Sequence, residues 1–226
     1  MQLPASIETT DVRAYESTYT VMVNDVPLFT PKGHPVTVPS WDLANAIADD
    51  LAEEGTLDLQ RVTLYSLYAT QRDFIEGRVD ATLGVILEHL PGDFVLHPDA
   101  DAALAAKQLM AWAPLLQFFR ELGPEVPMAR PLQQAQIPWE LTEALRLQLL
   151  AMNPAQLSVV LNAVMNCGSV SLGMLLARQA IALEQAVGAL IVTLTHVSRE
   201  REEQERFAAE TRQLVRRLLR YGRMPP

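Results

Sequence analysis

Residues 19–40, YTVMVNDVPLFTPKGHPVTVPS, contain two strand-like runs separated by turn residues. The first five residues are mostly β-branched or aromatic, which predicts a strand. Asn24 and Asp25 are turn formers, and residues 26–30 are expected to return as a second strand. Pro27 then lies at a sheet edge, where no backbone N–H is needed. A second turn and a short extended piece follow, so this stretch predicts a small β-rich unit.

An amphipathic helix is expected directly after the β-rich unit. Ser40 is a favourable residue for capping the start of a helix, and Gly55 is a favourable residue for ending one. Between these two positions, apolar residues recur every four residues and form one stripe. The pattern predicts a single helix with one buried face, which carries Leu43, Ile47 and Leu51.

Helical patterns cover most of the remaining chain. Residues 62–75 predict a helix in which Phe74 faces inward, and Pro114 is expected to kink or restart a helix over residues 103–122. A short buried strand is expected at residues 93–97, because its apolar residues run together. Further helices are expected at residues 79–89, 139–151, 155–177 and 179–220.

The two C-terminal helices carry further expectations. Gly168 and Gly173 are interpreted as positions where the missing side chain lets two helices approach closely. The helix at 179–220 is apolar in its first half and charged in its second, so the second half is expected to leave the core and run through solvent or along a partner. The predicted fold class is α+β, with a small β-rich N-terminal domain at 1–97 and a larger all-helical domain at 98–226.

Composition restricts the classes of function. The chain of 226 residues has a formal net charge of −9 and a pI near 4.9. Nucleic acids and anionic membranes are therefore disfavoured as partners, because both attract clustered cations. The single cysteine, Cys167, allows no intrachain disulfide and favours a reducing compartment. Residues 159–177 are as apolar as a membrane span, but Asn162 and Asn166 favour a buried core helix and no direct membrane span.

The sequence offers no convincing catalytic, metal-binding or cofactor-binding set. The histidines form no close pair with one another or with cysteine at ligand spacing, and no glycine-rich nucleotide loop is present. Cys167 and Ser169 lie close together, yet no base accompanies them in the sequence. We therefore expect a non-enzymatic protein without a catalytic residue, metal or cofactor. The four histidines are His34, His89, His97 and His196.

Two features of the C-terminal half are candidates for partner binding. Acidic and basic residues alternate over residues 200–206, a pattern typical of a solvated helix face. Glu200 and Glu203 in this run are candidate contacts with a partner. Trp139 follows a proline-rich loop; packing in the core is the default for tryptophan, but an exposed anchor is the alternative, since tryptophan is favoured at interfaces.

The N-terminal motifs follow a known pattern. Residues 27–31 read P-L-x-T-P, and residues 34–39 follow x-P-L-x-V-P with Val36 in place of leucine. Residues 44–48 then read A-x-A-I-A. Each motif is weakly specific alone, and their shared order and spacing make the combination moderately specific.

Later motifs keep the same order. Residues 108–114 read Q-x-x-x-W-x-P, and residues 168–172 read G-S-x-x-L. Over residues 19–190 the chain thus resembles the assembly chaperones of the ATP synthase catalytic head, of the type that binds the alpha subunit.

The chain departs from the family's sequence pattern in two places. The family's opening aromatic and basic segment, W-x-R-F-Y, is absent. The family's C-terminal motif, E-x-W-Q-x-E-x-W-G, is also absent, and the corresponding residues 194–201 contain no tryptophan and no glycine. In the family, an acidic residue of this motif is associated with client handling. No position of this chain matches that residue.

The resemblance implies a non-enzymatic factor that holds the alpha subunit before the head assembles. The alternative is the same fold retained as a permanent accessory or structural subunit of a large mitochondrial complex such as ATP synthase; an enzyme or small-molecule binder ranks last. The implied partner is the ATP synthase alpha subunit or an assembled mitochondrial complex. The first twenty residues resemble no targeting peptide, so the expected location is the mitochondrial matrix after presequence removal, or the cytoplasm of an alphaproteobacterium.

The predicted client surface is the β-rich segment together with the groove between it and the helical part. The predicted partner-binding residues come from this segment and from the two C-terminal features described above. The full set is Pro27, Leu28, Thr30, Pro31, Trp139, Glu200 and Glu203.

Overall fold

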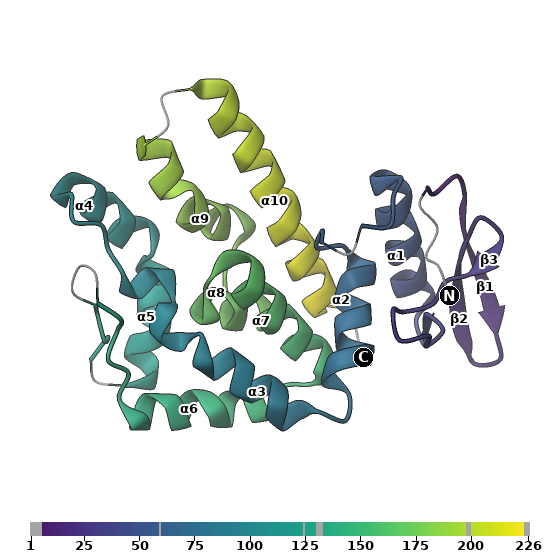
Figure 1. Ribbon diagram of the computed structural model, residues 1–226, viewed down its shortest axis with the longest axis horizontal. Coiled ribbons are helices and arrows are strands. Elements are labelled where there is room, and N and C mark those ends of the chain that lie inside the picture. The colour runs from purple at the N-terminus through teal and green to yellow at the C-terminus, as the bar shows by residue number, and fades with distance from the viewer. Residues whose placement is uncertain (1–5, 59, 124, 130–132, 198–199, 224–226) are drawn as a thin grey trace.

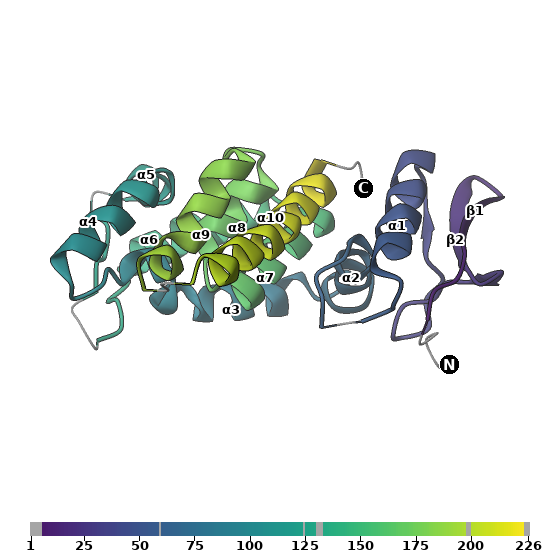
Figure 2. The ribbon, with the colours of Figure 1, turned by 90° about the horizontal axis from the view of Figure 1, so that it is seen from above.

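The protein is an elongated α+β molecule with a sheet at one end and helices over the rest, as the predicted fold class required (Figure 1). Seen from above, the sheet, α1 and α2 lie in a row that leads into the larger helical part (Figure 2). One continuous cluster of buried apolar side chains runs from the sheet into that part. The computed structural model describes residues 6–58, 60–123, 125–129, 133–197 and 200–223.

The N-terminal sheet is antiparallel and is organised around β2. On one side β2 pairs with β1, and on the other side it pairs with β3 and β4. The predicted strand at residues 19–23 is confirmed, and so is the edge position of Pro27, which pairs with Met22. The strand bounds are β1 Thr10–Tyr15, β2 Thr18–Val23, β3 Val26–Pro27 and β4 Thr37–Val38.

Strand β1 was not predicted, and its burial explains why. Val12 is its single buried residue, and the other five are half-buried or exposed. A strand that buries one side chain gives no alternating pattern of apolar residues. β1 is held by its pairing with β2 along its whole length, in a tight hairpin whose backbone hydrogen bonds require no apolar side-chain pattern in β1.

Helix α1, Trp41–Glu54, covers one face of the sheet and has the predicted ends. The Ser40 hydroxyl accepts a hydrogen bond from the Leu43 N–H, and Gly55 ends the helix with φ of 64° while its N–H donates to the Leu51 carbonyl. The left-handed conformation at that position favours glycine. The predicted stripe of Leu43, Ile47 and Leu51 is buried, as expected.

The prediction that Phe74 faces inward is wrong. The predicted helix is α-helical over α2, Leu64–Thr70, and then continues as a π-helical turn, η1, over Gln71–Ile75. A π-helical turn holds one extra residue and so rotates the side chains that follow. Phe74 is 51% exposed as a result, and the Lys32 ammonium lies 4.4 Å from the centre of its ring.

The prediction of a strand at residues 93–97 is also wrong. After α3, Val79–Glu88, the chain forms two 3₁₀ turns, η2 over Leu90–Gly92 and η3 over Phe94–Leu96. The fully buried Asp93 carboxylate accepts hydrogen bonds from the Val95 N–H at 3.3 Å and the Ser171 N–H at 2.8 Å. The apolar run is buried as predicted, but these side-chain bonds replace strand pairing.

The middle helices match their predictions. Pro114 restarts a helix, so the predicted element divides into α4, Ala102–Ala111, and α5, Ala113–Leu122. Between them, the buried Trp112 indole donates to the Ala189 carbonyl at 2.9 Å. Helix α6, Trp139–Leu150, follows the proline-rich segment and packs on α3 and α5.

The predicted helix at 155–177 is instead two helices, α7 over Pro154–Cys167 and α8 over Val170–Ala177. Gly168 separates them with φ of 67°, so its predicted role in close helix packing is wrong. Gly173 does have that role: a Cβ at this position would lie 3.0 Å from both the Cα and the carbonyl oxygen of Val160.

Replacing Gly173 with alanine is therefore expected to destabilise the protein by about 1–3 kcal/mol, because the atoms in the way are backbone and cannot rotate aside. Gly84 is the matched control: it is also helical, and a Cβ there would meet nothing within 4 Å. Gly84→Ala should stabilise by up to about 1 kcal/mol through helix propensity. Urea unfolding of both variants measures the difference, and equal effects would contradict the close approach of α7 and α8.

The single helix predicted at 179–220 is also wrong. The chain forms α9, Leu183–Val197, and α10, Arg201–Arg223, which lie side by side (Figure 1). The start of α10 is exposed, as the charge pattern indicated, but its second half returns to the core with Val215, Leu218 and Tyr221 buried.

The predicted division at residue 97 stays a prediction. Helix α3 packs on α6 and α7, and α2 contacts both α1 and α7. Residues 159–177 lie mostly in the core, as the two asparagines indicated. None of the helices within the described residues combines the length and the apolar character that crossing a membrane requires.

Candidate partner-binding site

The predicted N-terminal site residues divide into exposed and buried groups. Pro27 and Pro31 are exposed, whereas Leu28 is 2% exposed and Thr30 is 3% exposed. The Leu28 side chain belongs to the core. Of these four predicted residues, only the two prolines therefore present their side chains to a partner without rearrangement.

Thr30 forms part of a buried polar cluster around Asp73, in η1. The Thr30 hydroxyl donates to Asp73 Oδ1 at 2.7 Å, and the Lys32 backbone N–H donates to Oδ2 at 3.0 Å. The His34 ring nitrogen Nδ1 lies 2.8 Å from Oδ1, and the Lys32 ammonium donates to the Asp73 carbonyl at 2.6 Å. The cluster fastens the loop at residues 30–34 to the π-helical turn.

The Asp73 cluster predicts a specific acid sensitivity. Burial acts to raise the pKa of Asp73, but the hydrogen bonds from Thr30, His34 and Lys32 outweigh it and lower the pKa below 3.8. Because the pKa is lower in the folded state, the stabilisation is complete above the ordinary pKa and is lost as the pH falls through the folded value.

We expect Asp73→Asn to cost about 1–3 kcal/mol at neutral pH, and this difference from wild type to shrink as the pH falls below the ordinary carboxyl pKa of about 4. Asp49→Asn, an exposed change on α1, should cost less than about 0.5 kcal/mol. Urea titrations across this pH range measure both. A difference for Asp73→Asn that does not change with pH would contradict the assigned role of its carboxylate.

A shallow hollow of about 260 Å³ lies between the β-rich segment and the helical part. Residues of β4, α1, α2, η1, α7 and α10 line it. At its walls the Tyr68 hydroxyl donates to the Thr37 carbonyl at 3.0 Å, and the Tyr221 hydroxyl donates to Gln71 Oε1 at 2.6 Å. Burial raises the pKa of both phenols, so both remain protonated donors; the first joins α2 to β4, and the second joins α10 to η1.

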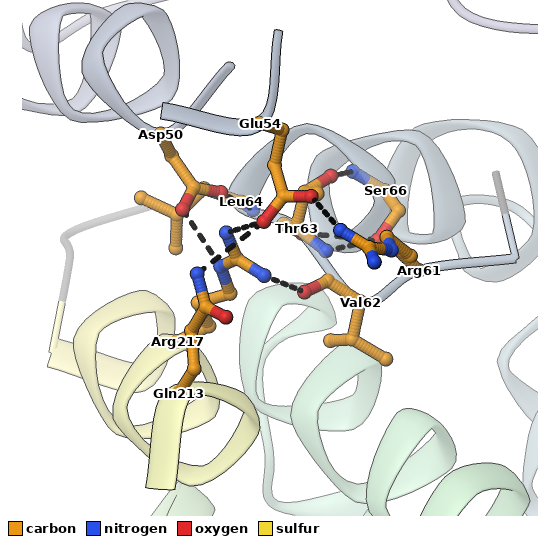
Figure 3. A network of polar contacts seen from close by, with 9 residues as sticks. All are labelled: Asp50, Glu54, Arg61, Val62, Thr63, Leu64, Ser66, Gln213 and Arg217. Atoms are coloured by element: carbon orange, nitrogen blue, oxygen red, sulfur yellow. Dashed lines mark hydrogen bonds and ion pairs between the residues drawn. The ribbon is translucent and has the colours of Figure 1, made fainter. Parts of the chain in front are cut away.

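A buried ionic network connects α10 to α1 (Figure 3). Arg217 of α10 donates from Nε to Asp50 at 2.7 Å and from Nη2 to Glu54 at 2.6 Å, and both carboxylates lie on α1. Its Nη1 donates to the Val62 carbonyl at 3.1 Å. The side chains of Arg217, Asp50 and Glu54 are 8%, 6% and 5% exposed.

Neighbouring groups complete the network. The second oxygen of Asp50 accepts from the Leu64 N–H at the start of α2 at 2.7 Å, and the second oxygen of Glu54 accepts from Arg61 at 2.6 Å. Burial acts to raise the pKa of Glu54, but the hydrogen bonds and charges of Arg217 and Arg61 outweigh it and lower the pKa. The network fixes α1, and with it the sheet, against the end of α10.

Helix α6 has two apolar faces, and only one is packed. Leu141, Leu145 and Leu149 are buried in the core. The opposite face is exposed, with Trp139 at 71% and Leu147 at 60% exposed, and it also includes Leu150 at 42%. These three positions fall within about 80° around the helix axis. We call Trp139, Leu147 and Leu150 the apolar face of α6.

Charged residues accompany the apolar face of α6. The Arg146 guanidinium Nε donates to both oxygens of Glu143, at 3.0 and 3.1 Å, and Glu140 lies in the first turn. Glu143 lies one turn from both Trp139 and Leu147, so a charged side chain stands between these two exposed apolar residues. Large apolar side chains that are exposed on one helix face mark a candidate site for binding another protein. An exposed tryptophan at such a site is a common energetic anchor.

The structure does not bring the predicted site residues into one surface. The edge strand β3, helix α6 and the start of α10 lie in three separate regions (Figure 1). Glu200 and Glu203 are both exposed near the turn between α9 and α10. Within the stretch that replaces the family's C-terminal motif, residues 198 and 199 lie outside the described part of the chain.

The described residues contain no group of three or more histidine, cysteine, aspartate or glutamate side chains arranged to hold a metal ion. Cys167 is half-buried, and burial raises the pKa of its thiol to about 12. The thiol therefore stays protonated at neutral pH and is a poor nucleophile.

Two solved structures share this fold. The crystal structure of Atp12 from Paracoccus denitrificans is similar with a TM-score of 0.72 and 22% identity, covering 96% of this chain and 97% of that chain. The Atu1473 protein of Agrobacterium tumefaciens is similar with a TM-score of 0.73 and 22% identity, covering 95% of this chain and 84% of that chain.

Sequence comparison gives the family. The model of the ATP12 chaperone protein family matches residues 5–120, about half of the chain. The chain belongs to this family, and the resemblance to ATP synthase assembly chaperones is confirmed. No curated protein sequence matches the chain.

Sequence reasoning found part of the apolar face and missed the rest. Trp139 was selected as a candidate anchor, whereas Leu147 and Leu150 were not. The available signal was that α6 carries leucines on two opposite faces, since a helix of a globular protein normally buries only one. The ionic network had no such signal, because Arg217 and its two carboxylates are more than 160 residues apart.

Proposed function

We propose that the chain binds an unassembled subunit of the ATP synthase catalytic head, the alpha subunit, and covers its apolar assembly surface until the head forms. Family membership supports the assembly-chaperone role. The observation that carries the binding mechanism is the apolar face of α6, three large side chains held in solvent by a helix whose other face is packed. This role requires no catalysis.

The size of the apolar face suits transient binding. Burying apolar surface stabilises a complex by about 25 cal/mol per Å² removed from water, and an aromatic anchor concentrates that energy. Three side chains on one helix form only the centre of an interface of ordinary size. We propose that the exposed Pro27, Pro31, Glu200 and Glu203 belong to further contacts, and that the buried Leu28 and Thr30 shape the loop that presents the two prolines.

A capture experiment tests this function. The tagged full-length chain is incubated with isolated alpha subunit, with isolated beta subunit and with the assembled head. We expect retention of the isolated alpha subunit and loss of that retention when beta subunit is added. Retention of beta subunit alone, or of the assembled head in preference to the isolated subunit, would overturn the proposal.

One observation favours a second function, that of a permanent accessory subunit. The family's C-terminal acidic and tryptophan-containing motif is absent from residues 194–201. A chain that keeps a fold after losing one of its sites can serve as a structural component. In that case the apolar face of α6 would be covered continuously in the complex, and the chain would co-purify with the assembled head. The location is proposed as the mitochondrial matrix or, in an alphaproteobacterium, the cytoplasm.

A further inference from the structure

An arginine stripe runs along the second half of α10. Arg212, Arg216, Arg220 and Arg223 are spaced four, four and three residues apart, so they lie on one side of the helix within about 80°. The three latter residues are exposed. This concentration of positive charge occurs on a chain whose net charge is −9.

The stripe borders an apolar hollow of about 370 Å³. Leu183, at the start of α9, and Leu219 of α10 form its apolar part, and Arg216, Arg220 and Arg223 line the rest. A row of arginines whose only purpose was to keep a helix face in water would not need an apolar hollow beside it. The hollow therefore combines a place for an apolar side chain with cations around it.

The charges at the hollow are only partly neutralised by the protein itself. Arg212 is held by Glu184 of α9 through two hydrogen bonds, of 3.0 and 2.8 Å, and this carboxylate also acts on Arg216. Arg223 donates from Nε to Gln179 Oε1, a neutral partner, at 2.6 Å. Arg216 and Arg220 have no hydrogen-bond partner among the described residues.

Two simpler roles do not account for the whole arrangement. Cations stabilise the last turn of a helix through its dipole, which suits Arg220 and Arg223 but not residues further back. Phosphate sites typically use the N–H groups at a helix N-terminus. The start of α9 borders this hollow, but a phosphate alone would leave the apolar side chains of Leu183 and Leu219 without a contact. An apolar surface bordered by unpaired guanidinium groups fits carboxylates and an apolar side chain together.

We propose that this hollow is a docking site for an acidic segment of a partner protein. An apolar side chain of the segment packs on Leu183 and Leu219, and flanking carboxylates pair with Arg216 and Arg220. Charge complementarity selects this occupant, since arginine binds carboxylates through paired hydrogen bonds. The site is separate from the apolar face of α6 and does not depend on the alpha subunit as client.

The test uses the full-length chain and a short fluorescent peptide of alternating glutamate and leucine residues, measured by anisotropy. We expect binding that weakens with salt and becomes at least about tenfold weaker in Arg216→Glu/Arg220→Glu. Arg120→Glu/Arg206→Glu makes the same change in net charge at other exposed positions and should bind like wild type. Because glutamate near a helix C-terminus can destabilise the fold, Arg216→Gln/Arg220→Gln is measured in parallel.

Several outcomes would overturn the proposal. The first is that the glutamate–leucine peptide does not bind the wild-type chain. The second is that Arg120→Glu/Arg206→Glu weakens binding as much as Arg216→Glu/Arg220→Glu does. The third is that a peptide of glutamate alone binds with the same affinity, which would show that the apolar hollow is not used. Stronger binding to vesicles containing phosphatidylserine, or to single-stranded RNA, would assign the arginine stripe to a membrane or a nucleic acid instead.

Discussion

Replacing Arg217 with methionine is expected to lower the free energy of unfolding by about 3–5 kcal/mol, the largest stability effect that we predict for a single side chain. Methionine keeps most of the volume of the arginine stem but leaves the buried carboxylates of Asp50 and Glu54 without their main cation. Removing one partner of a buried ionic network is costly because the remaining charge is neither solvated nor paired. Urea unfolding at neutral pH measures this loss.

A double substitution separates the ionic explanation from loss of packing. Asp50→Asn/Arg217→Met removes one of the stranded charges while its amide oxygen can still accept from the Leu64 N–H. The double variant should therefore be more stable than Arg217→Met alone. Arg216→Ala, an exposed neighbour on the same helix, should change stability by less than about 0.5 kcal/mol. A double variant less stable than the single variant would contradict the assigned role of the network.

The second large effect concerns binding rather than folding. Trp139→Ala combined with Leu147→Ser is expected to weaken binding of the isolated alpha subunit by at least about 30-fold, equivalent to about 2 kcal/mol. Both side chains are mostly exposed in the free chain, at 71% and 60%. Stability should therefore change by less than about 0.5 kcal/mol.

The matched control for this variant is Met110→Ser. Met110 lies on α4, outside the apolar face of α6, and is 81% exposed. It should leave both affinity and stability unchanged. Isothermal titration of the three proteins with alpha subunit gives the comparison. An equal loss of affinity in Met110→Ser would indicate a general response to a more polar surface. An unchanged affinity in the double variant would exclude the apolar face of α6 as the client surface.

Local signals in the sequence were sufficient for helix α1. A cap at Ser40, a left-handed end at Gly55 and a stripe of three residues between them define α1 without help from the rest of the chain. The same holds for Pro114, which restarts a helix because its ring is incompatible with the preceding turn. These features act over one or two helical turns, so a single sequence displays them.

Long-range interactions contribute to two of the elements that were predicted wrongly. The apolar run after Asp93 forms 3₁₀ turns because that carboxylate binds the start of α8, which is 78 residues away. The C-terminal residues form a helical hairpin in which α10 packs along α9 and Arg217 is held by α1. Apolar periodicity continues across such breaks and therefore suggests one long helix where there are two.

The candidate site was predictable only in part for the same reason. Trp139 could be selected from its residue type, but its exposure depends on which face of α6 the core takes up. Thr30 could be selected from its motif, and its hydroxyl turns out to bind Asp73, 43 residues later in the chain. A motif thus located an important residue without revealing whether it serves the fold or a partner.

The most direct test of the central claim is the native size and composition of the complexes that the chain forms in a gently prepared lysate. If the chain is a transient chaperone for the alpha subunit, it should migrate near its own mass of 25.1 kDa or together with the alpha subunit alone. The Trp139→Ala/Leu147→Ser variant should lose the population that migrates with the alpha subunit. Migration of the whole population with assembled ATP synthase, at fixed stoichiometry, would contradict that account and identify a permanent structural subunit.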